Sequence, residues 1–219
     1  MFGSKVGVPV LIAEIEAQIA AGKVPYRGAS SRAADAGSVE RTGVGIPAPP
    51  AELLYSLGMT CDSRALQVWK RMADLITPEP DDFLLELPWP FHYVDAICYG
   101  AELLGDAAAV PILQKIHAQP LLHGQSAKQG FQIDFNLEKR ALTEVTLART
   151  LARLGDVKGY ETLIEYLGDN RGTLAEFAHL ALEELTEVNN GKDQNAWTRW
   201  LAGVRDGLRP IPLVHRLDG

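Results

Sequence analysis

A short pattern recurs in the second part of this chain at intervals of about 50 residues, and it restricts the fold more than any other feature. Leu-Gly stands at 57–58, and Leu-Gly-Asp stands at 104–106 and again at 154–156. The three copies begin 47 and 50 residues apart. Helical-hairpin repeats of about 40–47 residues have this kind of spacing. We therefore expect the second part of the chain to consist of stacked pairs of helices.

The residues that follow each copy keep one common order. An aspartate can cap a helix because its carboxylate accepts hydrogen bonds from the first free backbone amides. The expected caps are Asp62, Asp106, Asp156 and, in a fourth copy, Asp193. A small residue follows each of them, at Ala65, Ala109, Gly159 and Ala196. Small residues at this position allow paired helices to approach closely, and the large apolar residues beyond them are expected to fill the core.

An amphipathic stretch precedes each cap, so the repeated unit is a helix, a tight turn and a second, capped helix. The expected first helices are 51–57, 92–104, 137–154 and 173–185. The expected second helices are 63–75, 107–117, 157–167 and 193–204. Gly58, Gly105 and Gly155 stand where C-capping glycines are common. The pattern predicts an all-α fold in which the pairs share one apolar core.

The segment 104–113, Leu-Gly-Asp-Ala-Ala-Ala-Val-Pro-Ile-Leu, resembles the bacterial HEAT-like repeat of the type also found in phycobilisome lyases. The segment 151–164 is similar to it. The resemblance covers roughly residues 50–206 and implies an α-solenoid of about four HEAT-like hairpins. The turns at 58–62 and 188–192 are longer than the repeat pattern, and the resemblance transfers no catalytic residue.

The rest of the chain divides by composition. Residues 1–23 are expected to contain one helix, at about 10–21, whereas 24–49 form a linker or long irregular arm rich in Gly, Pro, Ser and Ala. The repeats then span 50–206, and 207–219 form a C-terminal tail. Glu14 and Glu16 interrupt the first apolar stretch, which a secretory signal would not tolerate. We expect a cytoplasmic protein, although the abrupt apolar start also fits a chain cut from a longer one.

Charge and composition exclude several classes of partner and cofactor. The chain has 21 Lys and Arg against 28 Asp and Glu, a net charge of −7, which disfavours nucleic acid. No apolar run approaches the roughly 20 residues that cross a bilayer, so no membrane contact is expected. Two cysteines are too few for a thiolate metal site. The chain has no His-Glu dipeptide, which the di-iron hydroxylases with HEAT-like repeats require. We therefore expect no metal and no cofactor.

The histidines and cysteines are interpreted as structural residues. His117 and His123 flank a predicted turn and are interpreted as ordinary surface or turn histidines, because their spacing of six is not that of a helical metal pair. His179 shares a helix face with Glu176, which favours a packing or solvated contact. Cys98 lies in an apolar helix and is expected to be buried and inert. Cys61 precedes a helix start, where a thiolate would be favoured, but it has no histidine nearby in the sequence.

The tryptophans divide into two groups. Trp69, Trp197 and Trp200 occupy the large apolar positions of the repeat and are expected to pack in the core. Trp89 lies between two prolines, in Leu-Pro-Trp-Pro-Phe. An aromatic held in this way loses little entropy on binding. For Trp89 the sequence leaves two interpretations open, a cover for the core or an exposed contact.

These observations favour a non-catalytic module for protein–protein interaction or scaffolding. The second helices are expected to form its inner face, and the partner is a protein of unknown identity. The candidate contact residues are Arg64, Lys70, Arg71, Trp89, Gln114, Lys115, Lys158, Glu161, Glu165 and Arg199.

Two alternatives remain open. The chain could be the C-terminal accessory part of a larger bacterial enzyme, such as a flavin-dependent oxidoreductase, associated with it covalently or non-covalently. It could also handle a chromophore, as the phycobilin lyases that share its repeat type do.

Overall fold

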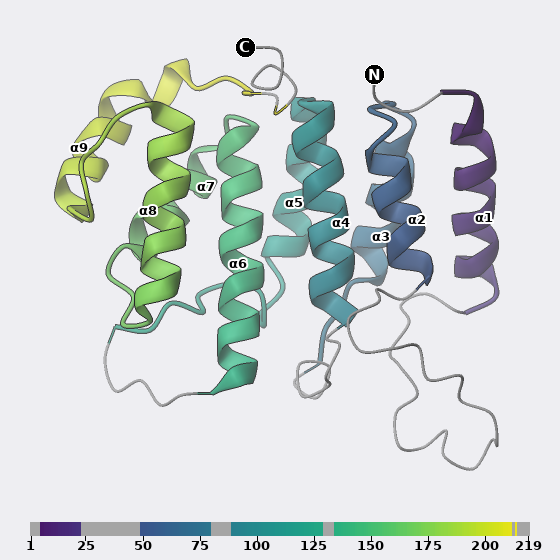
Figure 1. Cartoon of the computed structure of the whole chain (residues 1–219), viewed down its shortest axis with the longest axis horizontal. Helices are drawn as coiled ribbons and strands as arrows, with labels where there is room; N and C mark the ends of the chain where they lie inside the picture. Colours follow the sequence, from purple (N-terminus) through teal and green to yellow (C-terminus); the bar gives the residue numbers. More distant parts are fainter. Residues whose placement is uncertain (1–4, 23–48, 80–88, 129–133, 212, 214–219) are drawn as a thin grey trace.

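The computed structural model describes residues 5–22, 49–79, 89–128, 134–211 and 213 (Figure 1). Within these ranges the chain is helical and has no strand, which confirms the predicted all-α class. The α-helices are α1 (Val8–Ala20), α2 (Pro49–Gly58), α3 (Ala65–Leu75), α4 (Trp89–Leu104), α5 (Val110–His117), α6 (Phe135–Arg153), α7 (Val157–Tyr166), α8 (Gly172–Thr186) and α9 (Gln194–Val204). Each predicted helix is present, with ends that differ by a few residues.

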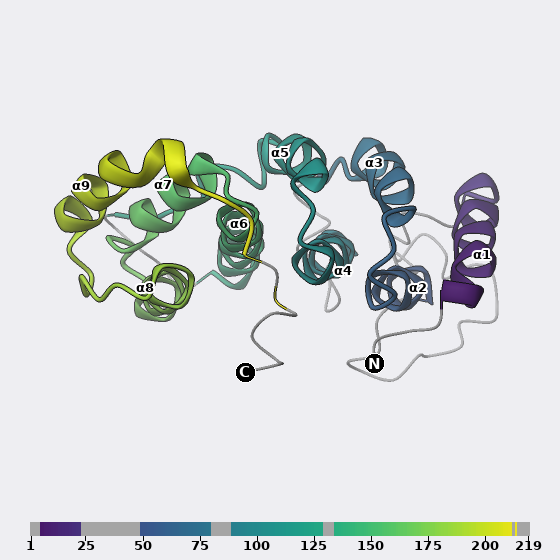
Figure 2. The ribbon, with the colours of Figure 1, turned by 90° about the horizontal axis from the view of Figure 1, so that it is seen from above.

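The helices after α1 form two rows. Figure 2 shows α2, α4, α6 and α8 in one row and α3, α5, α7 and α9 in the other. Within the first row each helix packs against the next, and in the second row α3 packs against α5 and α7 against α9. Helix α1 lies at one end, against α2 and α3. The first and second helices of the predicted pairs therefore lie on opposite sides of the molecule.

The buried apolar residues form two clusters that meet at α6. The first joins α1 to α5 with one side of α6, and the second joins the other side of α6 to α7, α8 and α9. Trp69 and Trp197 are fully buried, one in each cluster, and Trp200 packs partly buried against the second. The prediction that these tryptophans pack in the core is thus confirmed.

A buried polar network lies on α6 between the two apolar clusters. Glu102 of α4 accepts hydrogen bonds from Thr150 Oγ1 at 2.7 Å and from Arg149 Nε at 3.1 Å. Arg153, 1% exposed, donates from Nη2 to Glu184 of α8 at 2.6 Å. Buried charges are tolerated when they are paired in this way. The network connects α4, α6 and α8 across the boundary between the clusters.

Aspartates cap the second helices in three of the four predicted helix pairs. Asp156 accepts a hydrogen bond from the Lys158 amide at 2.8 Å and begins α7. Asp193 begins α9 in the same way, whereas Asp106 first caps a short 3₁₀ turn, Ala107–Ala109, which leads into α5. Asp62 differs, because it caps a turn that ends one residue before α3.

The predicted C-capping role is confirmed for two of the three glycines and is wrong for the third. Gly105, directly after α4, and Gly155, two residues beyond the end of α6, adopt positive φ angles of 63° and 82°. Gly58 instead belongs to α2, and Cys61 adopts the positive φ of that longer turn, 49°. A Cβ on Gly58 would lie 2.6 Å from the Cα of Gly100 in α4. Gly58 is therefore small because two helices of the first row meet there.

The chain beyond α9 returns to α6. A 3₁₀ turn, Arg205–Gly207, follows α9. The Ile211 amide then donates to the Arg153 carbonyl at 2.7 Å, so this part of the predicted tail is bound to the helical body. In the described ranges, no helix has both the length and the apolar character that crossing a membrane requires.

Candidate functional site

The candidate contact residues lie mainly on the second row, as expected. Arg64 directly precedes α3, which carries Lys70 and Arg71; Gln114 and Lys115 lie on α5, Lys158, Glu161 and Glu165 on α7, and Arg199 on α9. Trp89 begins α4, and its side chain lies outside the described part of the structure, so both interpretations of it stay untested.

Many of these side chains bind residues of neighbouring elements. Glu161 accepts from Arg205 at 3.2 Å, and Glu165 accepts from Ser126 at 2.6 Å. The other pairs are Arg64 with Asp62, Arg71 with Glu16, Gln114 with Asp156 and Lys115 with Asp74. Most of these pairs join one predicted helix pair to the next or to α1. They give this face a structural role, and its role in partner binding stays a prediction.

Four of the candidate residues meet around one hollow of about 480 Å³ on the second row. Gln114 lies on α5, whereas Lys158, Glu161 and Glu165 lie on α7. The complete lining is Gln114, His117, Ala118, His123, Lys158, Glu161, Thr162 and Glu165. His117 and His123 therefore line the same hollow as four of the predicted contact residues.

The two histidines of this hollow converge on a buried carboxylate that sequence reasoning did not single out. His117 Nε2 lies 3.4 Å and His123 Nδ1 lies 3.5 Å from Oε1 of Glu144, in the middle of α6. The two imidazole rings meet edge to face, with centroids 4.9 Å apart. Their ligand atoms and a Glu144 oxygen all lie within 4.8 Å of one another, a grouping that could hold a metal ion.

Hydrogen bonds fix the Glu144 carboxylate, which is 2% exposed. Its Oε1 accepts from the Gly124 amide at 2.7 Å, and its Oε2 accepts from the Gln125 amide and the Tyr166 hydroxyl, each at 2.7 Å. Burial alone would raise the pKa of Glu144, but His117, Tyr166 and the two amides together hold it below its usual value. Glu144 is therefore a carboxylate in the folded protein.

The sequence interpretation of these histidines was wrong in part. His117 is 6% exposed, so it is not a surface residue, whereas His123 is exposed in the turn as expected. The spacing of six excluded a metal pair only for one continuous helix. Helix α5 ends at His117, and the chain reverses before Gly124, which has a φ of 69°. That reversal places His123 back beside His117.

The other two residues considered for chemistry have structural surroundings. His179 on α8 lies 3.8 Å from Glu176 and 3.9 Å from Glu183 on its own helix, an edge contact as interpreted. Cys98 is fully buried, and burial raises its pKa strongly. Burial also raises the pKa of Cys61, which contradicts a thiolate favoured by the following helix.

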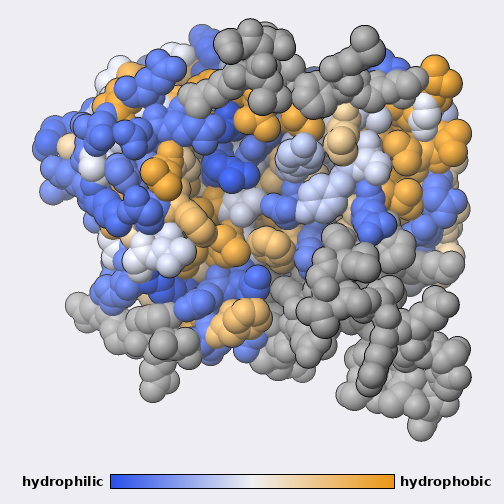
Figure 3. Space-filling view, viewed as in Figure 1, coloured by the Kyte–Doolittle hydropathy of each residue, from blue (hydrophilic) through white to orange (hydrophobic). Residues whose placement is uncertain are grey.

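A different kind of surface lies on the first row. Phe135 and Leu137 of α6 are 57% and 42% exposed, and Phe177 and Leu180 of α8 are 46% and 50% exposed. Figure 3 shows hydrophobic residues interspersed with hydrophilic ones over α6 and α8 on this face. Two hollows lie between α6 and α8, and both are lined by Leu142 and Phe177. We call Phe135, Phe177 and Leu180, which line these two hollows, the apolar patch.

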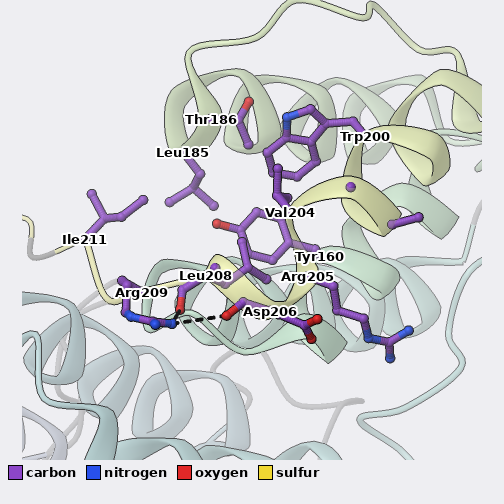
Figure 4. Close-up of a pocket in the computed structure, with 13 residues that line it drawn as sticks. Tyr160, Leu185, Thr186, Trp200, Val204, Arg205, Asp206, Leu208, Arg209 and Ile211 are labelled. Carbon is purple, nitrogen blue, oxygen red and sulfur yellow. Dashed lines mark hydrogen bonds between the residues drawn. The ribbon is translucent and has the colours of Figure 1, made fainter.

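A further hollow lies where the chain returns after α9 (Figure 4). Tyr160 and Trp200 form one wall, with ring centroids 5.7 Å apart. Arg209 donates to the carbonyl of Leu208 at 2.6 Å, so its guanidinium holds the turn itself. Burial raises the pKa of the Tyr160 phenol, which therefore remains protonated. These contacts describe packing of the C-terminal segment.

Comparison with known proteins gives no relative: no family model, no curated protein and no solved structure matches this chain. The expected resemblance to HEAT-like repeats therefore stays a prediction made from the residues of the chain itself.

Proposed function

We propose that this chain is a protein-binding module built as an α-solenoid of four HEAT-like hairpins. The hairpins would be α2 with α3, α4 with α5, α6 with α7 and α8 with α9. The two rows of helices support this arrangement, since each row contains one helix of every pair (Figure 2). The repeated aspartate caps support it at the level of sequence.

The apolar patch is the observation on which this proposal depends. Its three large hydrophobic side chains, each more than two-fifths exposed, lie on two adjacent helices and line two hollows that share Leu142 and Phe177. Scattered exposed hydrophobic residues are normal, but a contiguous group with aromatic residues is typical of a protein interface. The second row is a weaker candidate, because many of its charged side chains already bind neighbouring helices.

The shape of the surface favours an amphipathic helix from another protein as the bound segment. Helices α6 and α8 pack side by side, and the hollows between them are lined by Leu142, Phe177 and Leu180. A bound helix can place apolar residues at intervals of three and four into such a groove. Lys139, 5.3 Å from the centre of the Phe135 ring, adds a cation at the edge of the patch.

Site-specific photo-crosslinking in the native host tests this proposal. A photoreactive phenylalanine analogue at position 177 should crosslink a distinct protein, and the same analogue at position 199, on the opposite row, should not. The crosslinked partner is then purified. Phe177→Ser with Leu180→Ser should weaken its binding at least tenfold, and Lys70→Ala with Arg199→Ala should leave binding unchanged.

Other outcomes would overturn the choice of surface. Crosslinks from position 199 alone would support the second row, and a crosslink between two copies of this chain would replace a foreign partner with self-association. An enzyme as the partner would support the accessory-domain alternative. A partner that carries a bound chromophore would support the chromophore-handling alternative.

A further inference from the structure

His117, His123 and Glu144 offer three metal-ligand atoms that lie within 4.8 Å of one another. Two imidazole nitrogens and one carboxylate oxygen come from three separate places: the last residue of α5, the turn after it and the middle of α6. A zinc ion with bonds of about 2.0–2.1 Å in tetrahedral geometry separates its ligand atoms by about 3.3–3.4 Å. The distances from Glu144 to the two histidines, 3.4 and 3.5 Å, match that separation.

One hydrogen-bond acceptor position of the Glu144 carboxylate remains free, and it lies on Oε1, the oxygen that faces the two histidines. Each carboxylate oxygen can accept about two hydrogen bonds. Oε2 already accepts two, from Gln125 and Tyr166, whereas Oε1 accepts one, from Gly124. Oε1 is also the oxygen that faces both imidazoles. The remaining lone pair is therefore available to a metal ion at the point where the histidines converge.

His117 supplies an independent observation that points to a ligand. Its side chain is 8% exposed, and its buried Nε2 lies 3.4 Å from the Glu144 carboxylate without the alignment of a hydrogen bond. A buried polar atom without a partner costs about 1–3 kcal/mol, and native proteins seldom retain one without a reason. The same nitrogen lies 3.4 Å from Glu144 Oε1, so it faces into the cluster. Coordination of a metal ion would satisfy it.

The surroundings resemble those of sites that keep an exchangeable ligand. Backbone amides and the Tyr166 hydroxyl hold Glu144 in place, as outer contacts do around bound metals. His117 and His123 both line the hollow on the second row, so a fourth coordination position opens toward solvent. Zinc sites with three protein ligands and one water commonly have this form.

We propose that His117, His123 and Glu144 bind one divalent transition-metal ion, zinc in preference, with its fourth position open to the hollow between α5 and α7. The nitrogen and oxygen donors suit zinc, whereas calcium and magnesium prefer oxygen alone. This site lies on the second row and does not depend on protein binding at the apolar patch.

Metal titration of the purified full chain tests the proposal. Calorimetry with Zn²⁺ should show one saturable site per chain, and Co²⁺ should give the intense visible absorption of a tetrahedral complex. His123→Ala should weaken Zn²⁺ binding at least tenfold and remove the cobalt spectrum. His123 is 64% exposed, so its loss should leave the helical circular dichroism unchanged.

A matched control removes an imidazole elsewhere. His92→Gln, on α4, should retain the wild-type affinity and cobalt spectrum. Zn²⁺ should also raise the melting temperature of the wild type and of His92→Gln, but not that of His123→Ala, because binding to the native state alone stabilises it. The proposal is overturned if the wild type binds no stoichiometric metal, or if His123→Ala binds it as tightly as His92→Gln does.

Discussion

Gly58 of α2 and Gly100 of α4 face each other so closely that neither position has room for a side chain. A Cβ on Gly58 would lie 2.6 Å from the Gly100 Cα, and a Cβ on Gly100 would lie 2.5 Å from Cζ2 of Trp69. Both glycines are buried, and their helices pack within the first row. The contact joins α2 and α4 through backbone atoms.

Gly58→Ala should therefore lower the free energy of unfolding by about 1–3 kcal/mol, since the added methyl must push the two helix backbones apart. Urea denaturation followed by circular dichroism measures this loss. Gly203→Ala is the control: that glycine is exposed in α9 and has no atom within 4 Å of an added Cβ, so alanine should stabilise by about 0.5–1 kcal/mol. A Gly58→Ala protein as stable as the wild type would contradict the close approach.

This contact shows what the sequence could not reveal. The caps of α7 and α9 follow from local chemistry, since Asp156 and Asp193 bind amides two or three residues away. The small size of Gly58 depends on Gly100, 42 residues later, and a single sequence gives no sign of that pairing. The C-cap expectation for Gly58 follows from its place before a turn, whereas its small size is required by Gly100, which is distant in the sequence.

The candidate metal cluster was missed for a related reason. His117 and His123 stand out in the sequence, but Glu144 is one of 28 acidic residues and lies 21 residues beyond His123. Only the chain reversal after α5 and the packing of α5 on α6 bring the three together. The one sequence signal for this site is an acidic residue, Glu144, among the apolar residues of the stretch 137–154. The amphipathic pattern of that stretch predicts a helix but does not indicate that Glu144 is a ligand.

The two cysteines should differ in their reaction with thiol reagents. Cys98 is fully buried, and burial raises its pKa strongly, whereas Cys61 is partly exposed with its pKa raised by burial to a lesser degree. Because the thiolate is the reactive form, we expect slow alkylation of Cys61 at pH 7 that accelerates above pH ~9. Mass spectrometry should find one modified cysteine in the native protein and two in urea. Fast labelling of Cys98 under native conditions would contradict its burial.

The cap of α9 should make a measurable contribution to stability. Asp193 accepts hydrogen bonds from the amides of Asn195 at 2.9 Å and Ala196 at 3.0 Å. Asp193→Ala removes both and should cost about 1 kcal/mol in the free energy of unfolding. Asp193→Asn keeps an acceptor oxygen and should cost only a few tenths. Equal losses for the two variants would show that the negative charge, rather than the hydrogen bond, stabilises the helix.

A buried ion pair fixes the turn that contains His123 to the connection between α7 and α8. Asp169 and Arg171 are 7% and 6% exposed, and Asp169 Oδ1 accepts from Arg171 Nε at 2.8 Å. Asp169 Oδ2 accepts from the Ala127 amide at 2.8 Å, while Arg171 Nη2 donates to the Gln125 carbonyl at 2.6 Å. Burial alone would raise the pKa of Asp169, but Arg171 and the Ala127 amide together lower it.

The lowered pKa of Asp169 gives a pH dependence with a definite sign. Its carboxylate stabilises the native state above the unfolded pKa of about 3.9, and this stabilisation is lost as pH falls through the lower folded value. Asp169→Asn should cost about 3 kcal/mol at pH 7, because it leaves Arg171 buried without its charged partner. Urea denaturation at each pH should show this difference shrinking below pH ~4. Asp74→Asn, which removes an exposed pair with Lys115, should cost less than about 1 kcal/mol. A difference between wild type and Asp169→Asn that stays constant down to pH ~2 would show that Asp169 acts through packing and not through its charge.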